Sequence, residues 1–148
     1  CTNIPYTNIR MASLIGVDFP QRIVNRLILK ILNGEEIIIN QSSQTFGFLD
    51  VKDAVVGIVS LLDINPNNWK LCYNIGNEKA YSMLDIVETI KEVIENKSIK
   101  MPEIKYEINT NAGSTAVSYE LLKKDTGFEP SVNLKQSVEE IVNSLMKK

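Results

Sequence analysis

The junction at Asp50 between a strand-like run and an apolar helical pattern constrains the fold more than any other feature. Residues 36–40 contain three consecutive isoleucines, and β-branched residues favour strands. Asp50 precedes the pattern Val51–Leu62, and its carboxylate can accept a hydrogen bond from the free N–H groups of a first helical turn. Asp53, three residues later, completes a pattern like a capping box and favours the positive helix end. We therefore expect a short strand, a cap at Asp50 and a helix packed on a core through one apolar face: Val51, Ala54, Val55, Ile58 and Leu62.

Other stretches alternate in the same way between helix and strand signals. Helix caps are predicted at Asp18, Ser82, Ser118 and Asn133. Gly34 and Gly127 are placed to end two of these helices. Strands are predicted over residues 8–16, 69–76 and 104–108. This alternation predicts an α/β fold with a few mixed strands and about five helices.

The composition is that of one ordinary domain. A chain of 148 residues is long enough to bury a core. Its net charge of -2 offers no basic surface for nucleic acid, and no apolar run reaches the roughly 20 residues of a membrane span. Histidine is absent, which excludes His-based acid–base chemistry and His-ligated metal within this chain, and we predict no metal site. The cysteines Cys1 and Cys72 form no disulfide framework, and with no signal peptide we expect a reduced, cytoplasmic setting.

The stretch from Gln44 to Asp53 resembles a motif of the extended short-chain dehydrogenases/reductases, the family of NAD-dependent sugar-nucleotide epimerases and dehydratases. That family typically reads G-D-G-x-Q-x-R-D-F-x-x-V-x-D here, and this chain keeps Gln44, Phe48, Val51 and Asp53. Further matches follow in the family's order: Phe19-Pro20, Tyr73-Asn74-Ile75-Gly76 and Gly127-Phe128. The resemblance covers nearly the whole chain, but only the second half of a complete enzyme. It implies that residues 1–148 form the C-terminal substrate-binding lobe of a Rossmann-like protein whose N-terminal half is absent.

The resemblance also implies which residues would bind ligands. The substrate cleft would be lined by Ser13, Arg22, Asn25, Phe46 and Asn74. Met11 falls where the family lets the loop after the strand approach the nicotinamide of NAD. Three of these assignments have a plainer alternative: Ser13 belongs to a core strand that ends in a glycine turn, Arg22 is a solvated charge, and Asn74 bonds its own backbone in a turn.

The chain departs from the family where the substrate's phosphates would be held. The family uses an arginine there, and this chain has Phe46, followed by Gly47 in place of an aspartate. Losing a charge-assisted hydrogen bond typically costs ~1.5–3 kcal/mol, so nucleotide binding should be weaker or altered. Phe46 would instead face a less charged substrate or stack on a base.

The chemistry of the family is missing from these residues. No glycine-rich turn for the NAD pyrophosphate is present. The family also needs a Tyr-x-x-x-Lys pair, in which lysine lowers the tyrosine pKa. Tyr119 and Lys123 have that spacing, but we interpret them as part of a C-terminal helix and predict no catalytic residue in this chain. NAD would be bound mainly by the missing half, and the isolated chain should be inactive.

The resulting hypothesis is the substrate-binding part of a UDP-glucose 4-epimerase-like or dTDP-glucose 4,6-dehydratase-like enzyme. One alternative is an NAD(P)-dependent reductase of a carbonyl substrate without a nucleotide. Another is a binding or scaffold protein that kept the fold and lost the chemistry. A strand over residues 9–14 would also lose its neighbours in such a fragment, leaving an open sheet edge that tends to self-associate into homo-oligomers.

Overall fold

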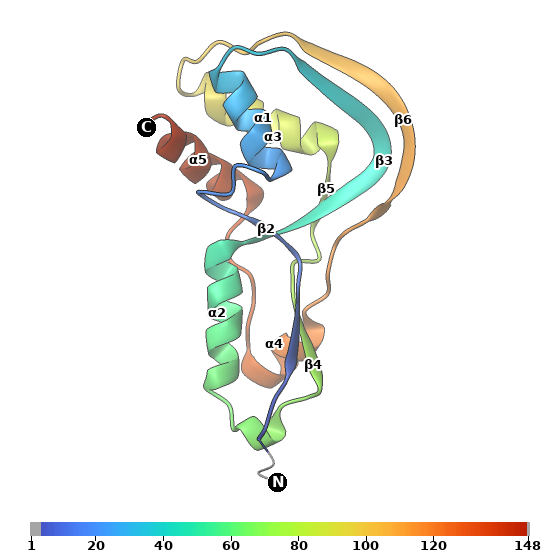
Figure 1. The fold of residues 1–148 in the computed structure, drawn as a ribbon, viewed down its shortest axis with the longest axis vertical. Helices are drawn as coiled ribbons and strands as arrows, with labels where there is room; N and C mark the ends of the chain where they lie inside the picture. The colour runs from blue at the N-terminus through green and yellow to red at the C-terminus, as the bar shows by residue number, and fades with distance from the viewer. Residues whose placement is uncertain (1–3, 148) are drawn as a thin grey trace.

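The computed structural model describes residues 4–147, except for the side chain of Asn109. It has an α/β fold with five α-helices among these residues, which confirms the predicted class (Figure 1). In chain order the elements are β1 (Asn8–Met11), β2 (Ser13–Ile15), α1 (Ile23–Leu32), β3 (Ile37–Asp50), α2 (Val51–Leu62), a 3-10 turn (Pro66–Asn68), β4 (Cys72–Ile75), β5 (Ala80–Ser82), α3 (Met83–Glu95), β6 (Ile104–Ser114), α4 (Glu120–Thr126) and α5 (Leu134–Leu145).

Strand β3 links the two parts of the molecule seen in Figure 1. Its first two thirds pair in parallel with β6, from the register pair Ile37 and Ile104 onward. It then pairs antiparallel with β5 and, at its end, in parallel with β2. The expectation of a short strand before Asp50 was wrong, because the β6 ladder keeps the polar residues between Asn40 and Gln44 extended. Strands β1 and β4 form a separate parallel pair.

The core consists of two apolar clusters. The upper cluster lies where α1, α3 and α5 pack together and against β3, and Ile28, Ile86 and Val138 are fully buried in it. The lower cluster lies between α2, α4 and β4, where Tyr73 and Leu122 are fully buried. Helix α2 follows β3 directly, so the junction at Asp50 lies between the two clusters.

Helix boundaries follow local capping where the cap is complete. Ser82 and Asp85 form a reciprocal capping box at α3, and Asn133 and Gln136 form one at α5, as predicted. Gly34 and Gly127 adopt the positive φ expected after α1 and at the end of α4. The prediction of a helix that begins at Asp18 was wrong.

The backbone at Asp18 explains why no helix begins there, because its φ of 66° is left-handed and not helical. Helix α1 therefore starts only at Ile23, after Arg22, and has no side-chain cap. Helix α4 likewise starts at Glu120 instead of directly after Ser118, although the Ser118 hydroxyl accepts a long hydrogen bond (3.4 Å) from the Glu120 N–H.

Helix α2 packs on the lower cluster, but not through the whole predicted face. Ala54, Gly57 and Leu61 are buried, whereas Val55 and Leu62 are exposed. Gly57 allows the close approach, because a Cβ there would lie 2.8 Å from Cγ2 of Ile75. Among the described residues, no helix is long and apolar enough to cross a membrane.

Candidate functional site

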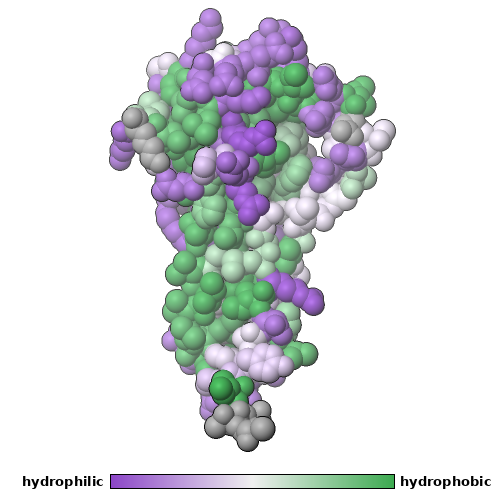
Figure 2. Space-filling model, in the orientation of Figure 1, coloured by the Kyte–Doolittle hydropathy of each residue, from purple (hydrophilic) through white to green (hydrophobic). Residues whose placement is uncertain are grey.

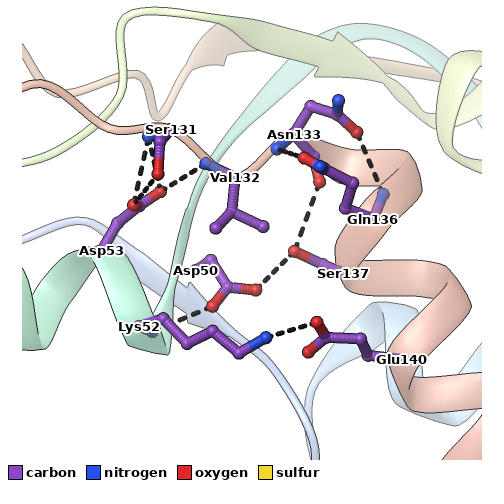
Figure 3. Close-up of polar contacts among 9 residues, drawn as sticks. All are labelled: Asp50, Lys52, Asp53, Ser131, Val132, Asn133, Gln136, Ser137 and Glu140. Atoms are coloured by element: carbon purple, nitrogen blue, oxygen red, sulfur yellow. Dashed lines mark hydrogen bonds and ion pairs between the residues drawn. The ribbon is translucent and has the colours of Figure 1, made fainter.

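The carboxylate of Asp50 holds the start of α2 in a buried polar network (Figure 3). One oxygen accepts a hydrogen bond of 2.9 Å from the Lys52 N–H, which is the predicted cap. The other accepts a hydrogen bond of 2.6 Å from the Ser137 hydroxyl on α5. The Lys52 ammonium also forms an ion pair with the carboxylate of Glu140, which lies on α5 like Ser137. The network thus joins the start of α2 to α5, two segments that are far apart in the sequence.

Asp53 has a different role from the predicted one. Its carboxylate accepts hydrogen bonds from the Ser131 N–H at 3.1 Å, the Ser131 hydroxyl at 3.0 Å and the Val132 N–H at 2.9 Å (Figure 3). The side chain is buried, so these donors compensate for the loss of water. Asp53 therefore anchors the loop before α5 and does not form a box with Asp50.

Phe46, at the position of the family arginine, takes part in packing. Its ring stacks on Phe48 with centroids 6.3 Å apart and an interplanar angle of 12°. It is half-buried against the upper cluster and lies opposite Tyr81 of β5. The Lys79 ammonium lies 5.2 Å from the Tyr81 ring centroid. Phe46 thus places an aromatic ring where the family has a positively charged side chain.

The neighbouring Gly47 has a steric reason to lack a side chain. Its N–H donates a hydrogen bond of 2.9 Å to the Thr115 hydroxyl, which brings the segment after β6 against β3. A Cβ at Gly47 would lie 2.6 Å from the Ala116 Cα. The family's aspartate would not fit at this position unless the 115–116 backbone moved.

Asn25 is the predicted site residue with the most constrained surroundings. It is buried on α1, and its Nδ2 donates a hydrogen bond of 3.0 Å to the Gly16 carbonyl. Its Oδ1 has no hydrogen-bond partner among the described residues, which is costly for a buried acceptor. Arg22, just before this helix, is exposed. Ser13 is exposed on β2 and lies in register with Phe48, the stacking partner of Phe46.

Asn74 lies elsewhere. It is in register with Arg10 of β1 and lines a hollow of about 300 Å³ with Arg10, Cys72 and Tyr119. None of the other predicted substrate residues lines this hollow. Met11 is exposed on β1, opposite Ile75. The structure therefore groups Ser13 and Phe46 through Phe48, whereas Asn74 lies in a separate hollow.

Tyr119 and Lys123 are each engaged with other groups. The Tyr119 ring packs edge-on against Phe128, with centroids 5.8 Å apart. The Lys123 ammonium lies 2.6 Å from a Glu129 carboxylate oxygen, and this contact raises the lysine pKa. The Glu129 carboxylate offsets the positive charge of Lys123, which leaves less net charge to lower a tyrosine pKa.

Sequence reasoning missed a groove between α1 and β3. Its volume is about 240 Å³, and its lining includes Leu27, Ile37 and Ile39 together with the cations Arg26 and Lys30. The two cations lie one helical turn apart on α1. The sequence signal that could have indicated this groove is the i, i+4 spacing of the two cations. A larger hollow of about 680 Å³ runs along α3 and carries several carboxylates, which would repel an anionic ligand.

Comparison with known proteins identifies the family. The model of the NAD dependent epimerase/dehydratase family matches residues 2–76. UDP-glucuronic acid decarboxylase 3 of Arabidopsis thaliana is 32% identical over 120 residues, which are 79% of this chain and 33% of that protein. UDP-glucuronic acid decarboxylase 1 of Danio rerio is 35% identical over 78 residues, 52% of this chain and 18% of that protein.

Solved structures show the same fold at lower identity. UDP-glucuronic acid 4-epimerase from Bacillus cereus, in complex with NAD, matches with a TM-score of 0.80 and 22% identity, over 97% of this chain and 44% of that chain. UDP-glucose 4-epimerase from Thermotoga maritima, with UDP-glucose, matches with a TM-score of 0.77 and 22% identity, over 96% and 46%. The chain thus spans about a third of the curated relative from Arabidopsis and less than half of these structures. By its family match and its fold, this chain belongs to the NAD dependent epimerase/dehydratase family.

Proposed function

We propose that residues 1–148 are the substrate-binding region of an NAD-dependent enzyme that epimerises, dehydrates or decarboxylates a nucleotide sugar. The single observation that carries this proposal is the groove between α1 and β3, which combines an apolar lining with Arg26 and Lys30. Similarity to UDP-glucuronic acid decarboxylases and the fold of UDP-sugar epimerases point to a UDP-sugar as the ligand.

The groove suits the two chemical parts of a nucleotide. Ile38 is exposed and Ile23 and Met83 are half-buried, so these three lining residues offer apolar surface to a base. Arg26 and Lys30 offer positive charge to a diphosphate. Neither cation forms an ion pair within the part of the chain described, so their charge remains for a ligand. These two residues would take over part of the phosphate binding that the family assigns to the arginine replaced by Phe46.

The described residues provide only the edge of a binding site for NAD. Gly16 is followed, after Val17, by the left-handed backbone at Asp18 instead of a helix N-terminus that could hold a pyrophosphate. The exposed side chain of Met11 is the one contact that we assign to the nicotinamide side. NAD supplies transient oxidation of the sugar when bound, and the residues of this chain would orient the sugar nucleotide. We place the binding of NAD and the proton transfer in a further α/β half, and the working enzyme in the cytoplasm.

A reductase of a nucleotide-free carbonyl compound is the second candidate. The observation that favours it is the packing of Phe46 on Phe48, which puts apolar rings where the family has a cation. A scaffold protein without chemistry is the third. The three candidates differ in the ligands that they predict for this chain.

Isothermal titration of the chain with UDP, UDP-glucuronic acid, UDP-glucose, dTDP-glucose, free sugars and NAD separates them. We expect heat with the UDP compounds and none with NAD. Arg26→Gln should weaken UDP binding by about tenfold to a hundredfold, the effect of losing a charged hydrogen bond. Arg10→Gln, in the hollow near Asn74, is the matched control and should bind as the wild type does. Tight NAD binding would contradict the proposal, and binding of no UDP compound would favour the reductase or the scaffold.

A further inference from the structure

Strand β6 is an edge strand with an open side. Within residues 4–147 it pairs with β3 and with no other strand. Figure 1 shows it at the outer rim of the molecule, and Figure 2 shows hydrophilic and hydrophobic residues side by side on this rim. The open side of an edge strand presents unpaired N–H and C=O groups, to which another strand can bind.

The hydrogen bonds to β3 determine which backbone groups of β6 face outward. The Ile37 N–H donates to the Glu103 carbonyl at 3.2 Å, and Ile37 lies in register with Ile104. In a parallel ladder a residue bonds to the two neighbours of its register partner, so the odd-numbered residues of 103–107 turn their backbone groups toward β3. The N–H and C=O groups of the even-numbered residues of 104–108 therefore point to the open side.

The side chains of the same segment separate into an apolar face and a charged face. Ile104, Tyr106 and Ile108 share one face, because side chains alternate along a strand. Ile104 packs against the upper cluster, whereas Tyr106 is 50% exposed and Ile108 is 92% exposed. Lys105 and Glu107 lie on the other face, and both are exposed. Aromatic and aliphatic side chains thus stand uncovered beside an open strand edge.

The sequence of residues 104–108 is complementary to a second copy of itself. In an antiparallel pair of two β6 strands with the two-fold axis at Tyr106, Ile104 lies opposite Ile108. Lys105 then lies opposite Glu107, in two symmetric pairs. Opposite charges across an antiparallel pair attract and like charges repel. An axis at Lys105 or at Glu107 would place like charges opposite each other, so the charges favour the axis at Tyr106.

The same register agrees with the direction of the backbone groups. The outward-pointing residues Ile104, Tyr106 and Ile108 would form the hydrogen-bonded pairs of the new ladder. Lys105 and Glu107 would form the pairs without hydrogen bonds, in which opposing side chains lie closest. Charge, apolar pattern and backbone direction therefore select one arrangement.

The common devices that protect an edge strand are lysines and β-bulges. A lone lysine would repel the same residue of another copy, but Glu107 supplies an opposite charge two positions later and has no ion pair among the described residues. Lys105 already contacts Glu36 of its own chain at 2.7 Å. The register with β3 shifts directly after Ile108, which limits the regular edge to residues 104–108. We expect a small interface and hence weak, reversible association.

We infer that β6 is a homodimerisation edge of this chain, at which residues 104–108 of two copies pair antiparallel. Tyr106 lies on the two-fold axis, and Lys105 of each copy pairs with Glu107 of the other. The sheet of each copy then continues into the sheet of its partner. The dimer requires no nucleotide, so it is tested apart from the proposed function.

Sedimentation equilibrium of the full chain at low salt, over a range of concentrations, should show a monomer–dimer equilibrium. Glu107→Lys should weaken it by about tenfold or more, because two attractive pairs become repulsive. Glu88→Lys is the matched control, since Glu88 is exposed on α3 and the change in net charge is the same. The double variant Lys105→Glu/Glu107→Lys exchanges the signs within each pair and should dimerise more tightly than Glu107→Lys.

Oxidative cross-linking tests the register, in a background where Cys1 and Cys72 are replaced by serine. Tyr106→Cys would place two thiols at the axis, where the Cα atoms of a hydrogen-bonded pair lie about 5.5 Å apart and a disulfide can form. Ile108→Cys is the control. The two copies of position 108 would be four strand positions or about 14 Å apart, so this variant should cross-link far more slowly although Ile108 is more exposed than Tyr106.

Three results would overturn the inference: a chain that stays monomeric up to about 1 mM, a dimer that is insensitive to Glu107→Lys, or cross-linking of Ile108→Cys as fast as that of Tyr106→Cys. The second result would mean that another surface joins the copies. Thermal unfolding should be nearly the same for Glu107→Lys and Glu88→Lys, which would show that the loss of dimer does not come from damage to the fold.

Discussion

The hydroxyl of Ser137 donates a hydrogen bond of 2.6 Å to the Asp50 carboxylate, and both side chains are buried. Asp50 caps α2 and Ser137 lies in the first turn of α5, 87 positions later in the chain. The hydrogen bond therefore fastens the strand–helix junction that organises the fold to the C-terminal helix.

Replacement of Ser137 by alanine should destabilise the protein by about 1–3 kcal/mol, because it leaves one oxygen of a buried carboxylate without its donor. Urea denaturation followed by circular dichroism would measure the change. Ser144→Ala, on the same helix and half-exposed, is the control and should change stability by no more than about 0.5 kcal/mol. Equal effects of the two variants would show that the Asp50–Ser137 hydrogen bond contributes little.

Asp53→Asn tests the anchor of the loop before α5. An amide keeps one acceptor oxygen and turns its NH₂ group toward the donors of Ser131 and Val132, so at least one N–H loses its partner. We expect a loss of about 1.5–3 kcal/mol in the free energy of unfolding and faster amide exchange at Ser131 and Val132. Unchanged exchange at both amides would refute the anchoring role.

Phe46→Arg should restore a cation for the phosphates. UDP-glucuronic acid should then bind about tenfold to a hundredfold more tightly, the worth of a charge-assisted hydrogen bond. The variant should also lose about 0.5–1.5 kcal/mol of stability with the Phe46–Phe48 stack. Phe46→Leu is the control, since it removes the stack without adding charge. Titration showing no gain in affinity for Phe46→Arg over Phe46→Leu would mean that position 46 does not face the phosphates.

Stability below neutral pH should depend on Asp85. Hydrogen bonds of 2.7 Å from the Ser82 hydroxyl and the Ser82 N–H hold the pKa of this carboxyl below its ordinary value of 3.8. Its contribution is therefore complete above pH 3.8 and is lost as the pH falls through the lowered folded-state pKa.

Asp85→Asn should accordingly lose less thermal stability than the wild type between about pH 7 and about pH 2. Thermal unfolding followed by circular dichroism across this range would measure the difference. Asp63→Asn, at the exposed C-terminal end of α2, serves as the control for general charge effects. Identical pH profiles of Asp85→Asn and the wild type would refute this role.

How far the fold could be predicted from the sequence depended on the distance between interacting residues. The caps at Asp50, Ser82 and Asn133 involve partners two or three positions away, and all three were predicted correctly. Strand β3 was predicted too short, because its polar residues are extended only through pairing with β6. Helix α1 was predicted to start too early, because the backbone at Asp18 is left-handed and not helical.

The candidate site shows the same limit. The sequence motif around Phe46 pointed to the family, which the comparisons confirmed. The motif did not indicate that Gly47 is required by the close approach of Ala116, or that Arg26 shares a groove with Ile37 and Ile39. Each of these contacts joins residues from different elements, so it exists only after the elements have packed.

The sequence by itself determined the family, the helices and their complete caps, because hydrophobic periodicity and hydrogen bonds between near neighbours depend on local order alone. Only the tertiary structure decided that Asp53 binds the loop before α5 and that Val59 and Leu62 of an apolar helix face outward. A buried carboxylate must take its donors from whichever segment packs against it, and the exposed face of a helix is defined only by what the rest of the chain leaves uncovered.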